Sequence, residues 1–264
     1  MPFKLDLRRK SGVMRSRLRY KAWSCTPEGR QNRERLLALK GKYEGRRCFV
    51  MGNGPSLLKC DLNRLAGEVT IVSNAHYLIW DKLVYIPTIL TIEDRLVAED
   101  RASTVRELSS ILKVFPYDLK RHLGEASESK LYVDFERQHS PFPQFSSRLD
   151  RLAYWGGTVS FLNLQLAAYL GCKQIIMIGF DHNYQVPKDQ IVNHVIQSQE
   201  ADVNHIHPDY FGPGYRWHDP NVARMEIGYE CAKRELERRG VEVLNATVGG
   251  HLEVFRRVPY ESLF

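Results

Sequence analysis

The sequence lacks any long apolar run. No segment approaches the ~18 consecutive apolar residues of a membrane-spanning helix, and residues 1–10 (MPFKLDLRRK) have none of the apolar character of a secretion signal. Internal repeats and low-complexity tracts are also missing. With 43% apolar and 26% charged residues, the composition excludes a disordered or fibrous protein. We therefore expect a soluble, cytoplasmic, globular protein.

Cysteine is sparse, with five residues in 264, and none belongs to a Cys-x-x-Cys pair. An odd number of scattered cysteines gives no sign of a disulfide framework. A reducing cytoplasm suits such a sequence. The positions are Cys25, Cys48, Cys60, Cys172 and Cys231.

Acidic residues are scarce in residues 1–47, where 15 Lys and Arg face 4 Asp and Glu, giving +11. The other residues hold 23 basic and 27 acidic side chains, a net charge of −4, so the overall net charge is +7. This distribution does not favour a nucleic-acid-binding core, and we expect no nucleic-acid partner for the main domain. Anionic lipid, a polyanionic substrate and RNA remain open as contacts of the basic segment, as does a solvated helix pair packed on the domain edge.

Two helices are expected before the first strand. Residues 13–23 (VMRSRLRYKAW) place apolar side chains at helical spacing among basic ones, which predicts a short amphipathic helix. Thr26 and Pro27 then supply an N-cap and a first-turn proline for a second helix over about residues 28–42.

The rest of the chain alternates short apolar runs with helical stretches. Wholly apolar runs predict strands buried on both faces, and the alternation predicts an α/β fold with a mostly parallel sheet and helices on both faces. We assign residues 1–45 to a basic helical extension and residues 46–264 to the main domain. The predicted strands occupy residues 48–52, 69–74, 87–94, 111–115, 130–135, 174–180 and 241–246, and the predicted helices residues 95–112, 159–170 and 220–239.

Two long stretches show no clear periodicity. Residues 136–155 are rich in Pro, Ser and aromatic residues, which is typical of a lid or an irregular insert. Residues 185–219 are polar, and we interpret them as a long functional loop.

A glycine-rich turn follows the first predicted strand, with Gly52, Asn53, Gly54 and Ser56 around Pro55. Two glycines let the backbone approach a phosphate, and amides at the next helix start attract anions. A leucine replaces the third glycine of a dinucleotide-binding fingerprint, and no Gly-Lys-Ser/Thr of a Walker loop follows. The pattern is compatible with a nucleotide site and with a simple tight turn.

A histidine precedes the last predicted helix, in the segment YRWHDP at residues 215–220. With an ordinary pKa of ~6.5, His218 can take a proton from a hydroxyl group at neutral pH, and a nearby carboxylate can orient it. The adjacent helix N-terminus would disfavour the imidazolium form. The alternative is structural: Asp219 caps the helix and His218 lines its entrance.

His205, His207 and Asp209 alternate along one stretch, so their side chains could share a face and bind a metal. The spacing indicates no further ligand, and histidines in polar loops are more often solvent-facing or hydrogen-bonded. We expect no metal site here, and the sequence leaves the roles of His205 and His207 open.

Several motifs together resemble the family named after 6-hydroxymethylpterin diphosphokinase, whose members often belong to bacterial surface-polysaccharide and flagellar glycosylation systems. The same succession is similar to the bacterial CMP-sialic-acid sialyltransferases with one Rossmann-like nucleotide domain. The resemblance spans about residues 47–250 and implies a Rossmann-like fold. The motifs that carry it are GNGPSL at 52–57 with Asp61, Ser73-Asn74, GCKQ at 171–174, IGFD at 178–181, and Asn245-Ala246-Thr247 with Gly249-Gly250.

The resemblance also implies site residues. His218 falls where the sialyltransferases carry a general-base histidine before a helix. Ser160 stands where that family has glycine, and Asn183, with Tyr184 beside it, stands where the family has tyrosine. The implied nucleotide-binding residues are Gly52, Asn53, Gly54, Ser56, Asn74, Thr158, Ser160, Gly179, Asp181 and Tyr184.

From these features we predict a glycosyltransferase, inverting and metal-independent, that moves a sugar from a nucleotide-activated, CMP-linked donor to a glycan or lipid-linked acceptor in surface-polysaccharide biosynthesis. His218 would be the general base, and no cofactor would be needed. Residues 1–24 would contact the inner face of an anionic membrane peripherally.

Two alternatives stay open. An ATP-dependent diphosphokinase would need Mg²⁺, for which Glu93, Asp94 and Asp181 could supply carboxylates. A non-catalytic nucleotide-binding protein would keep the glycine turn and have no need of His218.

Overall fold

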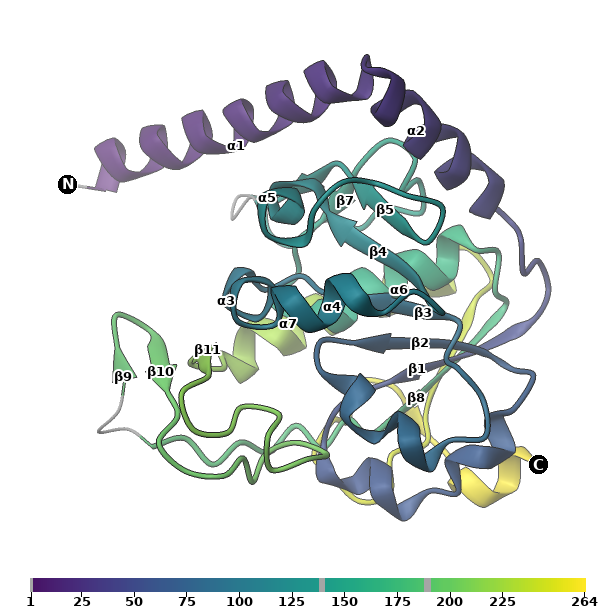
Figure 1. Cartoon of the computed structure of the whole chain (residues 1–264). Helices are drawn as coiled ribbons and strands as arrows, with labels where there is room; N and C mark the ends of the chain where they lie inside the picture. The colour runs from purple at the N-terminus through teal and green to yellow at the C-terminus, as the bar shows by residue number, and fades with distance from the viewer. Residues whose placement is uncertain (1, 138–140, 188–190) are drawn as a thin grey trace.

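The computed structural model describes residues 2–137, 141–187 and 191–264, with side chains from residue 12. Residue 1 of the predicted extension and small parts of the two predicted loops therefore lie outside the described residues. The main sheet has the order β13-β12-β8-β1-β2-β3-β4-β5, and every neighbouring pair of strands is parallel (Figure 1). This confirms the predicted α/β, Rossmann-like class.

The predicted strands are present, most of them shorter than their apolar runs. β13 was not predicted, because two arginines carry no strand pattern. The strands of the main sheet are β1 Arg47–Met51, β2 Val69–Ser73, β3 Ile89–Thr91, β4 Leu112–Pro116, β5 Lys130–Val133, β8 Gln174–Ile178, β12 Glu242–Asn245 and β13 Arg256–Arg257. Two small sheets stand apart from it: β6 Phe135–Glu136 with β7 Ala153–Tyr154, and β9 Ile191–Val192 with β10 Val195–Gln197 and β11 Arg216–His218.

The helices differ more from the sequence prediction. The first predicted helix is longer than residues 13–23, and the predicted helix 95–112 is wrong: it divides at Arg101, and the chain leaves helical conformation at Leu108 before β4. The α-helices are α1 Pro2–Ser24, α2 Pro27–Leu39, α3 Arg95–Asp100, α4 Ala102–Glu107, α5 Lys120–Leu123, α6 Val159–Tyr169 and α7 Val222–Glu237. Short 3₁₀ helices are η1 Pro55–Lys59, η2 Leu62–Leu65, η3 His76–Lys82, η4 Tyr117–Leu119 and η6 Tyr260–Leu263.

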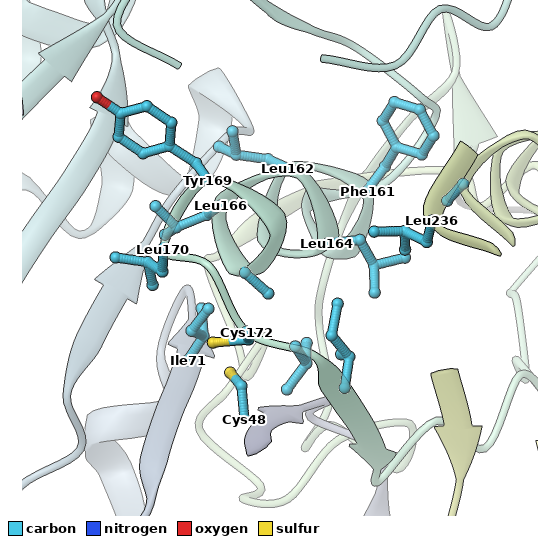
Figure 2. Packing of buried hydrophobic residues seen from close by; sticks show 14 of the residues in the cluster. Cys48, Ile71, Phe161, Leu162, Leu164, Leu166, Tyr169, Leu170, Cys172 and Leu236 are labelled. Carbon is cyan, nitrogen blue, oxygen red and sulfur yellow. The ribbon is translucent and has the colours of Figure 1, made fainter. Parts of the chain in front are cut away.

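Alternate side chains of the central strands pack into two separate hydrophobic clusters. Cys48 and Val50 of β1 pack into a cluster with α2, α6 and α7, as Figure 2 shows for Cys48, Cys172 and the leucines of α6. Phe49 and Met51 enter a second cluster beneath η1, η2 and η3. Burial on both faces explains why the strands appear as continuous apolar runs.

None of the described helices is long and apolar enough to cross a membrane.

Candidate functional site

Polar residues follow the carboxyl ends of the parallel strands, where open α/β sheets bind ligands. A cleft of about 1710 Å³ opens there, bounded by α1, the ends of β2 and β3, and the segment from β11 to α7. Figure 1 shows α1 and the β9–β11 ribbon on the same side of the molecule. Of the residues predicted for glycosyl transfer, Asn74, Thr158, Tyr184 and His218 line the cleft.

The glycine turn packs against the end of β8. A Cβ atom on Gly52 would collide with the carbonyl group of Gly179, and the Gly54 amide donates to that same carbonyl oxygen at 3.0 Å. The amide of Ser56 donates to Asp181 Oδ2 at 3.0 Å, and its hydroxyl group donates to Oδ1. The Ser56 amide at the start of η1, which we expected to bind a phosphate, therefore donates to the carboxylate of Asp181 instead.

None of these five residues is among the described residues that line the cleft, and neither are Asn53 and Ser160. Gly52 and Gly54 are needed because the turn after β1 packs too closely on the end of β8 to leave room for a Cβ atom. Their role in nucleotide binding stays a prediction.

Two asparagines at neighbouring strand ends carry unpartnered oxygens. Asn53 donates through Nδ2 to Ser73 Oγ at 3.1 Å, and its Oδ1 is buried without a partner among the described atoms. The Oδ1 of Asn74 is also buried without a partner, and the backbone there has φ 57°. A buried unsatisfied polar group costs about 1–3 kcal/mol. A ligand donor at this edge would remove that cost.

Thr158 and Ser160 begin α6. Thr158 caps the helix by accepting from the Ser160 amide, and it lines the cleft, whereas Ser160 is buried. Tyr184 lines the cleft as well, and burial raises its pKa above the ordinary value. The cleft lining therefore includes Thr158 and Tyr184 but not Ser160.

His218 forms a hydrogen-bonded pair with a carboxylate from another element. Its Nδ1 lies 2.6 Å from Oδ2 of Asp94, the residue that caps α3 through the Leu96 amide at 2.7 Å. The side chain of His218 is 52% exposed and that of Asp94 26%. With Nδ1 engaged, Nε2 is the ring nitrogen left to exchange a proton with a ligand.

The contact between His218 and Asp94 shifts the pKa of both side chains. The hydrogen bond from His218 to Asp94, with the negative charge of that carboxylate, raises the pKa of His218 above its ordinary value despite partial burial. Burial opposes the ionisation of Asp94, but the hydrogen bond and charge of His218 outweigh it and lower the pKa of Asp94.

The expected effect of a helix N-terminus on His218 is therefore wrong. His218 ends strand β11, and α7 begins four residues later at Val222, where Asn221 rather than Asp219 is the N-cap. Asn221 Oδ1 accepts from the Arg224 amide at 2.9 Å. The nearby carboxylate of Asp94, and not the helix, accounts for the direction in which the pKa of His218 is shifted.

The predicted long loop 185–219 is wrong as a description, because its described residues contain the antiparallel β9-β10-β11 sheet. Two arginines tie this part of the chain to the main domain. Arg216 forms ion pairs with Glu99 and Asp100, and Arg101 donates to two carbonyl oxygens at residues 209–210. These contacts hold β11 against α3 and so place His218 beside Asp94.

The carboxylates of the diphosphokinase alternative do not gather at one point. Glu93 pairs with Arg137, Asp94 with His218, and Asp181 bonds Ser56. Among the described residues, no group of three or more His, Cys, Asp or Glu side chains could hold a metal ion.

The histidines of the stretch 205–209 also separate. His205 hydrogen-bonds Asp202 at 2.7 Å and stacks on Tyr210 with 4.1 Å between ring centroids. His207 Nδ1 accepts from the Asp209 amide at 3.1 Å. His205 lies at the cleft within an aromatic cluster, and His207 does not line it.

Two groups of cleft residues have no recognisable signal in the sequence. Arg137, whose pKa is raised by Glu93 and Asp118 against its burial, bridges these two carboxylates. Arg15 and Arg19 reach the cleft from α1. An excess of eleven positive charges marks residues 1–47 as basic, but no local pattern separates the arginines that face a site from those that face solvent.

The fold and cleft define a parallel α/β protein with a ligand site at the carboxyl edge of its sheet. The chain belongs to the MptE-like family, described as 6-hydroxymethylpterin diphosphokinase MptE-like, whose model matches residues 26–187. This confirms the family resemblance read from the motifs. No curated protein matches the sequence.

Two solved structures are similar to the chain. The MAf glycosyltransferase from Magnetospirillum magneticum AMB-1 is 16% identical with a TM-score of 0.51, over 88% of this chain and 38% of that one. A mammalian sialyltransferase in complex with Gal-beta-1-3GalNAc-ortho-nitrophenol is 9% identical with a TM-score of 0.39, over 91% of this chain and 86% of that one. The first shares the fold, and this chain spans less than two fifths of its length.

Proposed function

We propose that the protein is a glycosyltransferase that moves a sugar from a nucleotide-activated donor, CMP-linked, to a glycan or lipid-linked acceptor in surface-polysaccharide biosynthesis. The observation that carries this proposal is the His218–Asp94 pair at a cleft beside the sheet edge. The name of the MAf glycosyltransferase, which shares the fold, supports the same class of reaction.

The proposed reaction is one inverting displacement. An acceptor hydroxyl oxygen forms a bond to the anomeric carbon while the bond from that carbon to the donor phosphate oxygen breaks, and the nucleotide leaves with the electron pair. The hydroxyl proton passes to Nε2 of His218, while Nδ1–H donates to Asp94. In this scheme Asp94 fixes the tautomer and orientation of the base, as carboxylates do in other histidine dyads. The step uses neither a metal nor a cofactor.

The donor would lie along the strand ends. Asn74, Thr158 and Tyr184 line the cleft, and the unpartnered amide oxygen of Asn74 suits a hydroxyl or amino group of a nucleoside. An oxygen acceptor does not stabilise a phosphate, so contact of this oxygen with the ribose or base fits better than contact with the phosphate.

A diphosphokinase that uses ATP and Mg²⁺ is the second proposal, because the description of the family names that activity. A nucleotide-binding protein without catalysis is the third. The three differ in the ligand they require and in the need for His218.

A thermal-shift panel separates the donors. CMP, CTP, UDP, GDP and ATP are tested with and without Mg²⁺, and a cytidine nucleotide without metal should give the largest shift. A ligand at 100 times its Kd stabilises by ~2.7 kcal/mol, or roughly 5–10 °C for a chain of this size. A shift with ATP and Mg²⁺ alone would support the kinase instead.

A matched pair of variants locates the nucleotide. Asn74→Gly removes the amide at a backbone with φ 57° that glycine accepts, so it should reduce the shift without strain. Asn193→Gly is the control, because Asn193 has φ 51° and does not line the cleft. Equal shifts in both variants would exclude Asn74 from the nucleotide site.

A further inference from the structure

Two arginines of α1 form part of the cleft wall. Arg15 and Arg19 are one helical turn apart, are exposed and line the cleft. Neither forms an ion pair with any acidic side chain in the part of the chain that the structure describes. Their guanidinium groups therefore face the cleft with their charge uncompensated.

The helix that carries them is fixed at its C-terminal end. Trp23 stacks on Tyr117 with 4.8 Å between ring centroids, and Tyr20 contacts the same ring edge-on at 5.4 Å. Both side chains are 8% exposed. Arg17, on another face of the helix, pairs with Glu136 at 3.2 Å. Arg15 and Arg19 thus belong to a wall that packing holds in place.

The other cations of the cleft are largely neutralised. Arg137 bridges Glu93 and Asp118, and Lys120 pairs with Glu28 and Glu125. These pairs also account for most of the acidic groups in the cleft, since Asp94 is held by His218. Arg95 and Arg121 also line the cleft, and they share the carboxylate of Glu99 with Arg216. The cleft cations that pair with no acidic side chain among the described residues are the α1 arginines and Arg224, whose guanidinium group lies 5.3 Å above the ring of Trp155.

We propose that Arg15 and Arg19 bind a carboxylate or phosphate group of the acceptor, so that the acceptor is an anionic glycan. The inference rests on the proposed glycosyl transfer and adds the chemical class of its second substrate. The nucleotide-binding residues expected for the donor come from other elements, the strand ends and α6. Guanidinium forks match carboxylate and phosphate geometry and form short, charge-assisted hydrogen bonds.

The test measures anion binding to the full-length protein. Calorimetry at low salt uses tetragalacturonate as the carboxylate probe, its methyl ester as the neutral probe of equal length, and inorganic phosphate. The acid should bind and the ester should not. In Arg15→Gln/Arg19→Gln the affinity for the acid should fall at least tenfold, because both charge-assisted contacts are lost.

Lys21→Gln/Arg33→Gln is the matched control, since it removes the same charge from exposed positions outside the cleft. Its affinity should stay within twofold of the wild type, and both variants should keep the wild-type melting temperature. Phosphate binding that is tighter than tetragalacturonate binding and shows the same arginine dependence supports the proposal and assigns a phosphorylated acceptor. Equal loss in the control, equal binding of the ester, or no binding of either anion would overturn it.

The nucleotide shift of the same variants separates the two proposals. Arg15→Gln/Arg19→Gln should keep the wild-type response to the cytidine nucleotide. If no nucleotide binds while anion binding still depends on Arg15 and Arg19, the glycosyltransferase assignment fails and the anion site stands.

Discussion

The imidazole of His218 meets two requirements of a general base. One ring nitrogen is oriented by Asp94 at 2.6 Å, and the side chain lies at the cleft with half its surface exposed. Because Asp94 raises the pKa of His218, the proposed base is stronger, but a smaller fraction of it is neutral at a given pH.

Replacing His218 with Ala should lower turnover by ~10²–10⁴-fold, the usual contribution of a positioned base. Nucleotide affinity should hardly change, because the donor contacts lie on other residues. Turnover with a competent donor and acceptor, and calorimetry with the nucleotide, measure the two effects. His251→Ala, at an exposed position outside the cleft, is the control. Full activity in His218→Ala would remove His218 from the reaction.

The pH dependence follows from the Asp94 contact. Activity requires neutral His218, so kcat/KM should rise with pH through the raised pKa of His218. In Asp94→Asn the carboxylate charge is lost, the pKa of His218 falls, and the acid limb of the profile should move to lower pH. The maximal rate should fall too, because the base is weaker and less well oriented. A limb that stays in place would mean that another group controls the profile.

At the scale of elements, the junction of β1 and β8 depends on the absence of a side chain at Gly52. A Cβ atom there meets the Gly179 backbone, which cannot move without disturbing the end of β8. We expect Gly52→Ala to lower the free energy of unfolding by about 1–3 kcal/mol, or roughly 2–12 °C in melting temperature. Calorimetry measures the change. Gly12→Ala in α1, where nothing lies within 4 Å of the added atom, should leave the free energy of unfolding unaltered or raise it.

The β9–β11 sheet has a different role, because it carries a catalytic candidate instead of building a core. β11 pairs with β10 from Val195 to Gln197, and the Arg216 contacts to α3 set its distance from the main sheet. The position of His218 is thus a product of two elements that are about 120 residues apart in the chain.

At the scale of the whole molecule, α1 has two distinct faces. Arg15 and Arg19 line the cleft, while Met14 and Leu18 are 62% and 58% exposed, with exposed Lys21 further along the helix. We propose that this apolar and basic face contacts anionic membrane, with the cleft open to acceptors at the surface. The side chains of residues 1–11 lie outside the described part of α1, so the proposal rests here on residues 12–24.

Met14→Ser/Leu18→Ser should weaken adhesion to phosphatidylglycerol vesicles at least tenfold, because burying such side chains stabilises by about 1.5–3 kcal/mol each. Salt should weaken adhesion as well, since each basic residue near the surface contributes ~1 kcal/mol. Sedimentation with vesicles measures it. Val84→Ser/Ile86→Ser, an exposed apolar pair elsewhere, is the control. Deleting residues 1–24 is less informative, because it removes Tyr20 and Trp23 from a buried cluster. Wild-type protein that ignores vesicles at low salt would contradict the proposal.

The sequence by itself determined the parallel α/β class, all strands of the main sheet except β13, and the family. Strands buried on both faces must be apolar throughout, so runs such as CFVM and QIIMI mark β1 and β8 without knowledge of their neighbours. Glycine before α6 and after it, and polar residues at strand ends, are equally local signals. The edge of the sheet that carries the site follows from them.

Only the tertiary structure decided what surrounds the site. Asp94 and His218 are 124 positions apart, and their contact depends on how β11 is held against α3. The two- and three-residue strands of the β9–β11 sheet are too short to show an alternation of apolar and polar residues. Arg15 and Arg19 line the cleft only because Tyr20 and Trp23 pack α1 against Tyr117. Local patterns report which residues are buried, whereas contacts between distant segments set which polar groups meet.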